Sequence, residues 1–128
     1  MIQKQTWLLV NDGTNILWTQ TFQLYKGFYR KSTKLGLFIK GSTRVVKPPK
    51  QEYKGFKFKY FKKGDIIRML ITRQKYNIYR FDGSVFKTKK NTSLILKKKQ
   101  DTQSKYFYGP AIRQLNRKRF LALFKTTL

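Results

Sequence analysis

Short runs of apolar and β-branched residues, each ended by a turn signal, constrain the fold of this 128-residue chain more than any other feature. Residues 5–10 end at an Asn-Asp-Gly turn signal, and residues 15–25 come close to alternating apolar and polar side chains. Residues 66–72 form the most apolar run and follow a Lys-Gly-Asp turn. Runs this short, with turn residues between them, predict strands rather than long helices.

Two further runs, at residues 35–40 and 43–47, are separated by Gly41-Ser42, and we expect them to form two separate strands. A Pro-Pro pair then interrupts any strand ladder, so residues 47–63 are expected to form a basic loop or ribbon. Within it, lysines alternate with aromatic residues over positions 56–60. That alternation predicts an extended segment with one aromatic and one cationic face.

Asp82-Gly83 lies between two short runs, at residues 78–81 and 84–88, which predicts a tight β-hairpin. Residues 93–96 predict one more buried strand. Beyond the Gly-Pro pair at 109–110, the chain changes to apolar residues at three- and four-residue spacings. This pattern predicts one or two short helices with an apolar face, and a proline is favoured at a first helical position.

The pattern as a whole predicts a single, mainly β domain over residues 1–128. Many short strands at close spacing favour a small barrel over residues 1–100, with the basic loop 47–63 and the hairpin 78–88 attached to it. The C-terminal helical segment, 109–125, is expected to pack on the barrel. The length allows one modest core but not two domains.

The charge of the chain predicts its partner. Lys and Arg number 30 against 5 Asp and Glu, a formal net charge of +25. The chain is 40% hydrophobic and 16% aromatic, too apolar for a disordered basic tail, so the charge belongs to a folded domain. Such a surplus calls for an anionic partner, and a nucleic acid is the partner we expect. An anionic membrane or another polyanion is the alternative.

The residue types that are missing exclude several function classes. Without cysteine there are no disulfides, thiolate zinc sites or cysteine nucleophiles, and without histidine the usual general base is missing. The five acids are scattered along the chain without a carboxylate motif. We therefore expect neither an enzyme nor a metal or cofactor site. No apolar run approaches the roughly 20 residues that a membrane span needs.

Five motifs in the same order and at similar intervals carry a resemblance to a known family. They are Met1-Ile2-Gln3-Lys4-Gln5-Thr6, Lys62-Lys63-Gly64-Asp65, Thr72-Arg73, Arg80-Phe81-Asp82-Gly83-Ser84 and Tyr108-Gly109-Pro110-Ala111-Ile112-Arg113-Gln114-Leu115. In these motifs the chain resembles large-subunit ribosomal protein L-fourteen. The resemblance extends over nearly the whole chain, although its middle third departs from the family pattern.

The resemblance implies a five-stranded β-barrel with a hairpin extension and small C-terminal helices. It implies a structural constituent of the large ribosomal subunit, bound to rRNA at the subunit-interface side beside proteins of the L-three and L-nineteen types. A bridge to small-subunit rRNA and a docking surface for a ribosome silencing factor are also implied. The divergence and a composition rich in residues with AT-rich codons indicate a mitochondrial member, synthesised inside the organelle, with a plastid or an AT-rich bacterium as alternatives.

We expect the cations within or beside the matched motifs to bind rRNA, because Lys and Arg neutralise phosphates. These are Lys62, Lys63, Arg68, Arg73, Arg80, Arg113 and Arg117. Arg68 could equally face solvent. Arg113 and Arg117 are expected on one helical face, four residues apart, turned toward RNA or a neighbouring protein. Local clusters form a second group: Arg44, Lys47, Lys50, Lys54, Lys57 and Lys59; Lys87, Lys89 and Lys90; and Lys97, Lys98 and Lys99.

Lys105, just before the Gly-Pro turn, matches the part of the family near the silencing-factor surface. The main alternative to a ribosomal protein is a free organellar nucleic-acid-binding protein, either OB-like or a nucleoid component. That alternative predicts a stable free protein that binds DNA and RNA alike, whereas a ribosomal protein sediments with the large subunit. A membrane-active cationic protein would need one large amphipathic helix, which the strand pattern does not favour.

Overall fold

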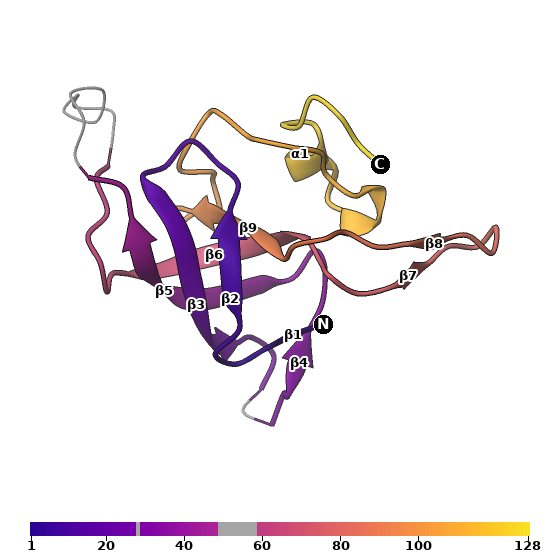
Figure 1. The fold of residues 1–128 in the computed structure, drawn as a ribbon, viewed down its shortest axis with the longest axis horizontal. Helices are drawn as coiled ribbons and strands as arrows, with labels where there is room; N and C mark the ends of the chain where they lie inside the picture. The colour runs from indigo at the N-terminus through magenta and orange to yellow at the C-terminus, as the bar shows by residue number, and fades with distance from the viewer. Residues whose placement is uncertain (28, 49–58) are drawn as a thin grey trace.

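A computed structural model describes residues 1–27, 29–48 and 59–128, and it is mainly β (Figure 1). Within these ranges the helical elements are a 3-10 turn at Arg113–Leu115 and α1 at Lys118–Leu121. The strands are β1 (Ile2–Gln3), β2 (Trp7–Val10), β3 (Ile16–Leu24), β4 (Ser32–Thr33), β5 (Phe38–Val46), β6 (Ile66–Arg73), β7 (Ile78–Tyr79), β8 (Val85–Phe86) and β9 (Thr92–Leu96).

Five of these strands close into a barrel in the order β2-β3-β5-β6-β9. The neighbours pair antiparallel except where β2 meets β9 in parallel, with Leu9 opposite Thr92 and Val10 opposite Ser93. Closure removes the exposed sheet edges at which a strand could pair with another chain. The predicted barrel, hairpin extension and short C-terminal helices are confirmed.

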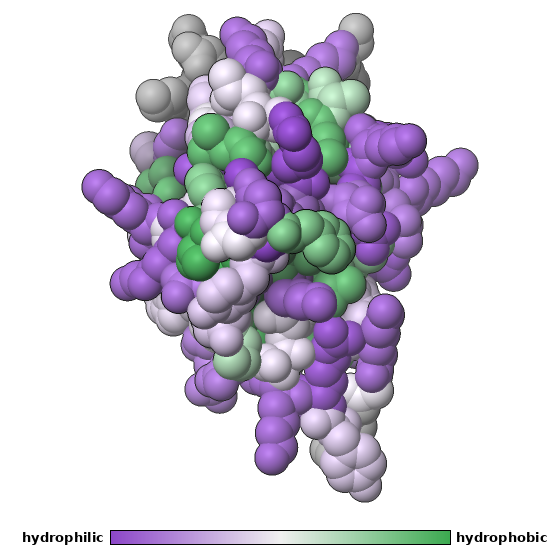
Figure 2. All heavy atoms as spheres, turned by 90° about the vertical axis from the view of Figure 1, so that its right-hand side faces the viewer, coloured by the Kyte–Doolittle hydropathy of each residue, from purple (hydrophilic) through white to green (hydrophobic). Residues whose placement is uncertain are grey.

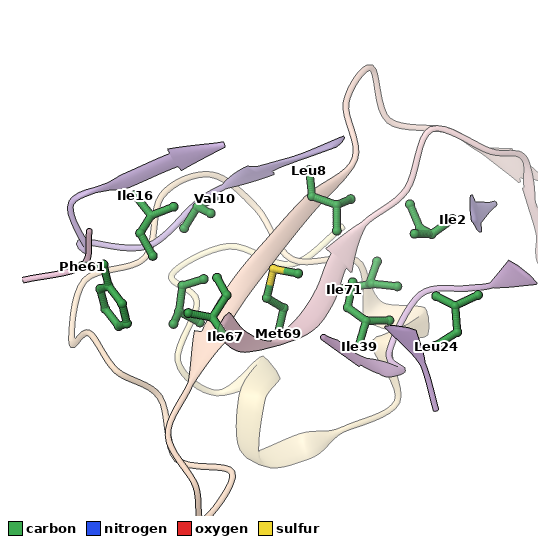
Figure 3. Packing of buried hydrophobic residues seen from close by; sticks show 11 residues of the cluster. Ile2, Leu8, Val10, Ile16, Leu24, Ile39, Phe61, Ile67, Met69 and Ile71 are labelled. Atoms are coloured by element: carbon green, nitrogen blue, oxygen red, sulfur yellow. The ribbon is translucent and has the colours of Figure 1, made fainter. Parts of the chain in front are cut away.

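The barrel interior holds one hydrophobic core. Alternate residues of the strands point inward, among them Leu8 of β2, Ile39 of β5 and Met69 of β6, and all three are fully buried (Figure 3). Phe61 enters this core from outside the strands, where the buried Asn15 side chain holds its backbone. The amide Nδ2 of Asn15 donates to the Phe61 carbonyl at 2.8 Å, and its Oδ1 accepts from the Phe61 N–H at 3.0 Å.

The prediction of two separate strands at 35–40 and 43–47 is wrong, because β5 runs unbroken through Gly41-Ser42. Gly41 does not make a turn; its missing side chain lets Met69 and the backbone of Gln20 lie close to β5. A Cβ at this position would lie 2.5 Å from Met69 Cε and 2.6 Å from the Gln20 carbonyl oxygen. A glycine inside a strand often marks such a close contact.

Two short strand pairs lie outside the barrel. β1 and β4 pair antiparallel, an element that the sequence patterns did not indicate. β7 and β8 form the predicted hairpin, which projects from the barrel, with strands shorter than the expected runs at 78–81 and 84–88 (Figure 1). The tip is stabilised locally, since the Arg80 N–H donates to the Ser84 carbonyl and Gly83 takes a positive φ of 85°.

The C-terminal segment covers the outer face of β6 and β9 and forms a second core there. Leu70 and Leu94 of the sheet pack in this cluster with Leu115, Phe120 and Phe124. The helices are shorter than the predicted segment 109–125, because Asn116 adopts a left-handed conformation with φ of 53°. No helix in the described ranges has the length and hydropathy to cross a membrane.

Candidate nucleic-acid interface

The uncovered part of the outer sheet face carries two cations side by side. Lys40 of β5 pairs in register with Arg68 of β6, which in turn pairs with Leu96 of β9. The next row, at Leu70 and Leu94, lies under the C-terminal segment, so the row at Arg68 marks where that cover ends. Arg68 is therefore exposed on the barrel exterior, a position open both to RNA and to solvent.

A groove of about 550 Å³ runs along this uncovered face. Ile66, an exposed residue of β6, provides an apolar patch in its wall. Asp101 is the one carboxylate among the described lining residues, and Arg119 forms an ion pair with it. The groove is thus strongly positive, because its lining includes six cations: Lys40, Lys59, Arg68, Lys97, Lys98 and Lys99.

The turn that leads into β6 presents two more lysines. Lys62 and Lys63 are both exposed at this turn. The turn is held from both sides: Asp65 Oδ2 accepts from the Lys62 N–H at 2.9 Å, and the Thr43 hydroxyl donates to the Lys62 carbonyl at 2.6 Å. Gly64 has a positive φ of 92° with open space around it. The K-K-G-D motif is therefore a fixed turn that displays two cations.

The second group of predicted residues is only partly brought to this face. Arg44 lies exposed on β5, on the same side of the strand as Lys40. Lys47 is half-buried; its N–H donates to the Asn15 carbonyl and its own carbonyl accepts from the Tyr60 hydroxyl. Three further predicted cations fall outside the described residues: Lys50, Lys54 and Lys57.

Arg73, at the far end of β6, makes internal contacts. Its Nε donates to Thr92 Oγ1 at 3.0 Å, and burial lowers the pKa of its guanidinium from the ordinary value. Its guanidinium also packs against Gly109, where an added Cβ would come within 3.1 Å of it. Two of the matched motifs therefore meet in space at this contact.

The hairpin carries a separate cation. The Arg80 guanidinium stacks on Phe86, with Cζ 5.1 Å from the ring centroid. Beside it, the hydroxyl and the N–H of Ser84 both donate to the Asp82 carboxylate. The hydroxyl bond first, and the N–H bond second, hold the pKa of that carboxyl below its ordinary value. Arg80 and the exposed lysines after β8, Lys87, Lys89 and Lys90, thus belong to a second, projecting surface.

Arg113 and Arg117 do not share a helical face, and that expectation is wrong. Arg113 lies exposed in the 3-10 turn, whereas Arg117 precedes α1 in an extended conformation with φ of −130°. The Arg117 Nε donates to the Gly36 carbonyl at 2.7 Å, and its guanidinium lies 4.3 Å above the Phe38 ring. Arg117 thus ties the C-terminal segment to the barrel.

Lys105 is exposed on the loop before Gly109 and is not among the described residues that line the groove. On the face seen in Figure 2, hydrophilic side chains project around smaller patches of exposed hydrophobic residues. Exposed cations outside the groove lining include Lys105 and Lys125.

Comparison with known proteins agrees with this geometry. A family model described as ribosomal protein L14p/L23e matches residues 1–127. The chain belongs to this family. A relative from Tetrahymena pyriformis, the large ribosomal subunit protein uL14m, is 31% identical over 124 residues, which is 97% of each chain.

In this L14p/L23e member, sequence reasoning missed a buried polar cluster. The Asn-Asp-Gly signal at 11–13 was interpreted only as a turn, but Asp12 is buried. Its carboxylate accepts from the Thr14 N–H at 3.0 Å, the Thr14 hydroxyl at 2.5 Å and the Ile95 N–H at 3.0 Å. Burial nevertheless raises its pKa above the ordinary value of 3.8, against the effect of these bonds.

The motif comparison also missed Lys26, Arg30 and Lys40, which lie in the part of the chain that departs from the family pattern. Lys40 lines the groove, and the other two line a smaller neighbouring cavity. A period-two reading of the run at 35–40 places Lys40 on the outer face, so that signal was available for Lys40. No comparable signal exists for Lys26 and Arg30, which are in a loop.

Proposed function

We propose that the chain is a structural constituent of the large ribosomal subunit of mitochondria and binds rRNA through the groove and its flanking lysine turn. The observation that carries this proposal is the set of six cations in one groove, beside a barrel that belongs to a ribosomal protein family. The similarity to uL14m supports both the large subunit and the mitochondrion.

The role proposed is architectural rather than catalytic. Folded rRNA packs its phosphates closely, and a row of fixed Lys and Arg side chains reduces the repulsion that opposes this packing. Contacts to phosphates position the protein without reading sequence. Because A-form helices hide their major-groove edges, we expect recognition of helix shape, 2′-hydroxyls and phosphates.

Further partners are proposed from the family resemblance alone. Neither the hairpin residues nor Lys105 are among the described residues that line the groove, and Lys105 is exposed. We assign them to neighbouring ribosomal proteins of the L-three and L-nineteen types, to a bridge with small-subunit rRNA, and to a ribosome silencing factor at Lys105.

A salt titration of RNA binding tests the groove. The variants Lys40→Gln, Arg68→Gln and Lys98→Gln each remove one groove cation, while Lys125→Gln removes an exposed cation outside it. We expect each groove variant to weaken binding to a fragment of large-subunit rRNA and to reduce the slope of log K against log salt by about 1. Equal losses in the control and in the groove variants would show that binding follows net charge and would contradict the proposal.

A further inference from the structure

A second, smaller cavity adjoins the groove. It has a volume of about 210 Å³ and shares Arg68 and Leu96 with the groove, so the two hollows meet at the end of the Lys40–Arg68–Leu96 row. Tyr25, Phe38 and Leu96 contribute apolar walls. The cavity therefore combines direct access from the proposed RNA-binding face with a partly hydrophobic interior.

Four cations surround the cavity: Lys26, Arg30, Arg68 and Arg117. The three arginines are held by backbone carbonyls rather than by carboxylates. Arg30 Nε donates to the Ser32 carbonyl at 2.9 Å, Arg68 Nη1 to the Lys98 carbonyl at 3.3 Å, and Arg117 Nε to the Gly36 carbonyl at 2.7 Å. Since a carbonyl does not neutralise a guanidinium, each arginine keeps its charge and further N–H donors for a ligand.

Tyr25 adds an unusual feature to this cavity. Its hydroxyl is buried and has no hydrogen-bond partner among the described residues. A buried polar group is normally paired, so a small rotation of Tyr25 that brings this hydroxyl to the cavity surface would allow a ligand atom to satisfy it. No Asp or Glu belongs to the described lining of the cavity, which makes an anionic ligand the best match.

We propose that this cavity binds one unpaired nucleotide of the RNA that occupies the groove, an inference that rests on the proposed function. The base contacts Tyr25, Phe38 and Leu96, with the Tyr25 hydroxyl bonded to one of its polar edge atoms. The phosphate contacts the arginines. Single-stranded positions, whose bases are free to leave the stack, are where proteins hydrogen-bond to RNA bases most readily. The groove thus holds the backbone while the cavity holds one extruded base.

Adenosine 5′-monophosphate, inorganic phosphate and adenosine are suitable probes for the free, full-length chain. In NMR titrations we expect the nucleotide to shift the Arg30 and Arg68 Hε signals and the Tyr25 ring signals at lower concentrations than phosphate or adenosine alone. The reason is that only the nucleotide fills both the apolar and the cationic part of the cavity. Phosphate binding as tightly as the nucleotide, or shifts located elsewhere, would overturn the proposal.

Tyr25→Phe is the most informative variant, because it removes a hydroxyl that makes no bond in the free protein. We expect its thermal stability to be equal or higher, because a buried hydroxyl without a partner is removed, while its affinity for the nucleotide falls about fivefold, the worth of one hydrogen bond. Tyr79→Phe, which changes an exposed ring on the hairpin, serves as the matched control and should bind normally.

Arg30→Gln should lower nucleotide affinity about tenfold, and Arg30→Lys less, since a charge-assisted bond is partly restored. Full nucleotide affinity in Tyr25→Phe and Arg30→Gln would overturn the nucleotide site. If these variants also keep the salt-dependent binding of the rRNA fragment, the proposed function of the groove stands without it.

Discussion

At the scale of single residues, Asp12 is the position where charge and stability are most directly coupled. In Asp12→Asn an amide NH₂ replaces one carboxylate oxygen, so either the Ile95 N–H or the Thr14 groups lose an acceptor in a buried site. We expect a loss of about 1–3 kcal/mol in unfolding free energy, the typical penalty for an unsatisfied buried group. Urea denaturation monitored by circular dichroism measures it.

The same residue gives a pH dependence with a defined sign. Burial raises the pKa of Asp12 in the folded state above 3.8. At a pH between the pKa of Asp12 in the unfolded state and its pKa in the folded state, the folded state therefore binds more protons than the unfolded state. The contribution of Asp12 is therefore complete below about pH 3.8 and is lost as the pH rises through the folded pKa. The difference in stability between the native chain and Asp12→Asn should narrow over this range. A gap that widens with pH would contradict this assignment.

Local conformation was predictable where a motif forms its own structure. The K-K-G-D motif is the predicted turn, closed within four residues, and Lys62 and Lys63 are exposed on it. The internal contacts of Arg73 and Arg117 were not predictable. Their partners are distant in the sequence, Gly36 being 81 positions from Arg117, and only the closed fold brings them together.

At the scale of secondary-structure elements, Gly41 decides whether β5 can run unbroken against β3 and β6. Gly41→Ala would place a methyl group against Met69 and the Gln20 carbonyl, and we expect it to lower the unfolding free energy by about 1–3 kcal/mol through overpacking. Ser42→Ala, on the half-exposed outer face, is the control and should stay within about 0.5 kcal/mol of the native chain. An equally stable Gly41→Ala variant would mean that the strands are further apart at this point.

Strands with strong local signals were predicted well, and those that depend on distant packing were not. The hairpin at Asp82-Gly83 and the apolar strand β6 follow from turn chemistry and hydrophobic runs. In β5 the glycine resembled a turn signal because its neighbours across the barrel are invisible in the sequence. The C-terminal segment has the apolar spacing of a helix, but the left-handed Asn116 divides it into two short turns.

At the scale of the whole molecule, the net charge of +25 predicts a class of partner but not a surface. The structure assigns a location to part of that charge, because the C-terminal segment covers one part of the outer sheet face and leaves the row at Lys40 and Arg68 open. Composition cannot specify this division. It depends on which face of the barrel the last residues pack against.

If this barrel functions as part of a large ribosomal subunit, as we propose, it must travel with that subunit in cell extracts. The direct test is sucrose-gradient sedimentation of mitochondrial lysate that contains the tagged full-length chain, with large-subunit rRNA followed in the same fractions. We predict that the chain sediments with the large-subunit rRNA and moves to the top of the gradient after ribonuclease treatment. A chain found mainly in the top fractions of an untreated lysate, apart from intact large subunits, would contradict the claim and favour a free nucleic-acid-binding protein.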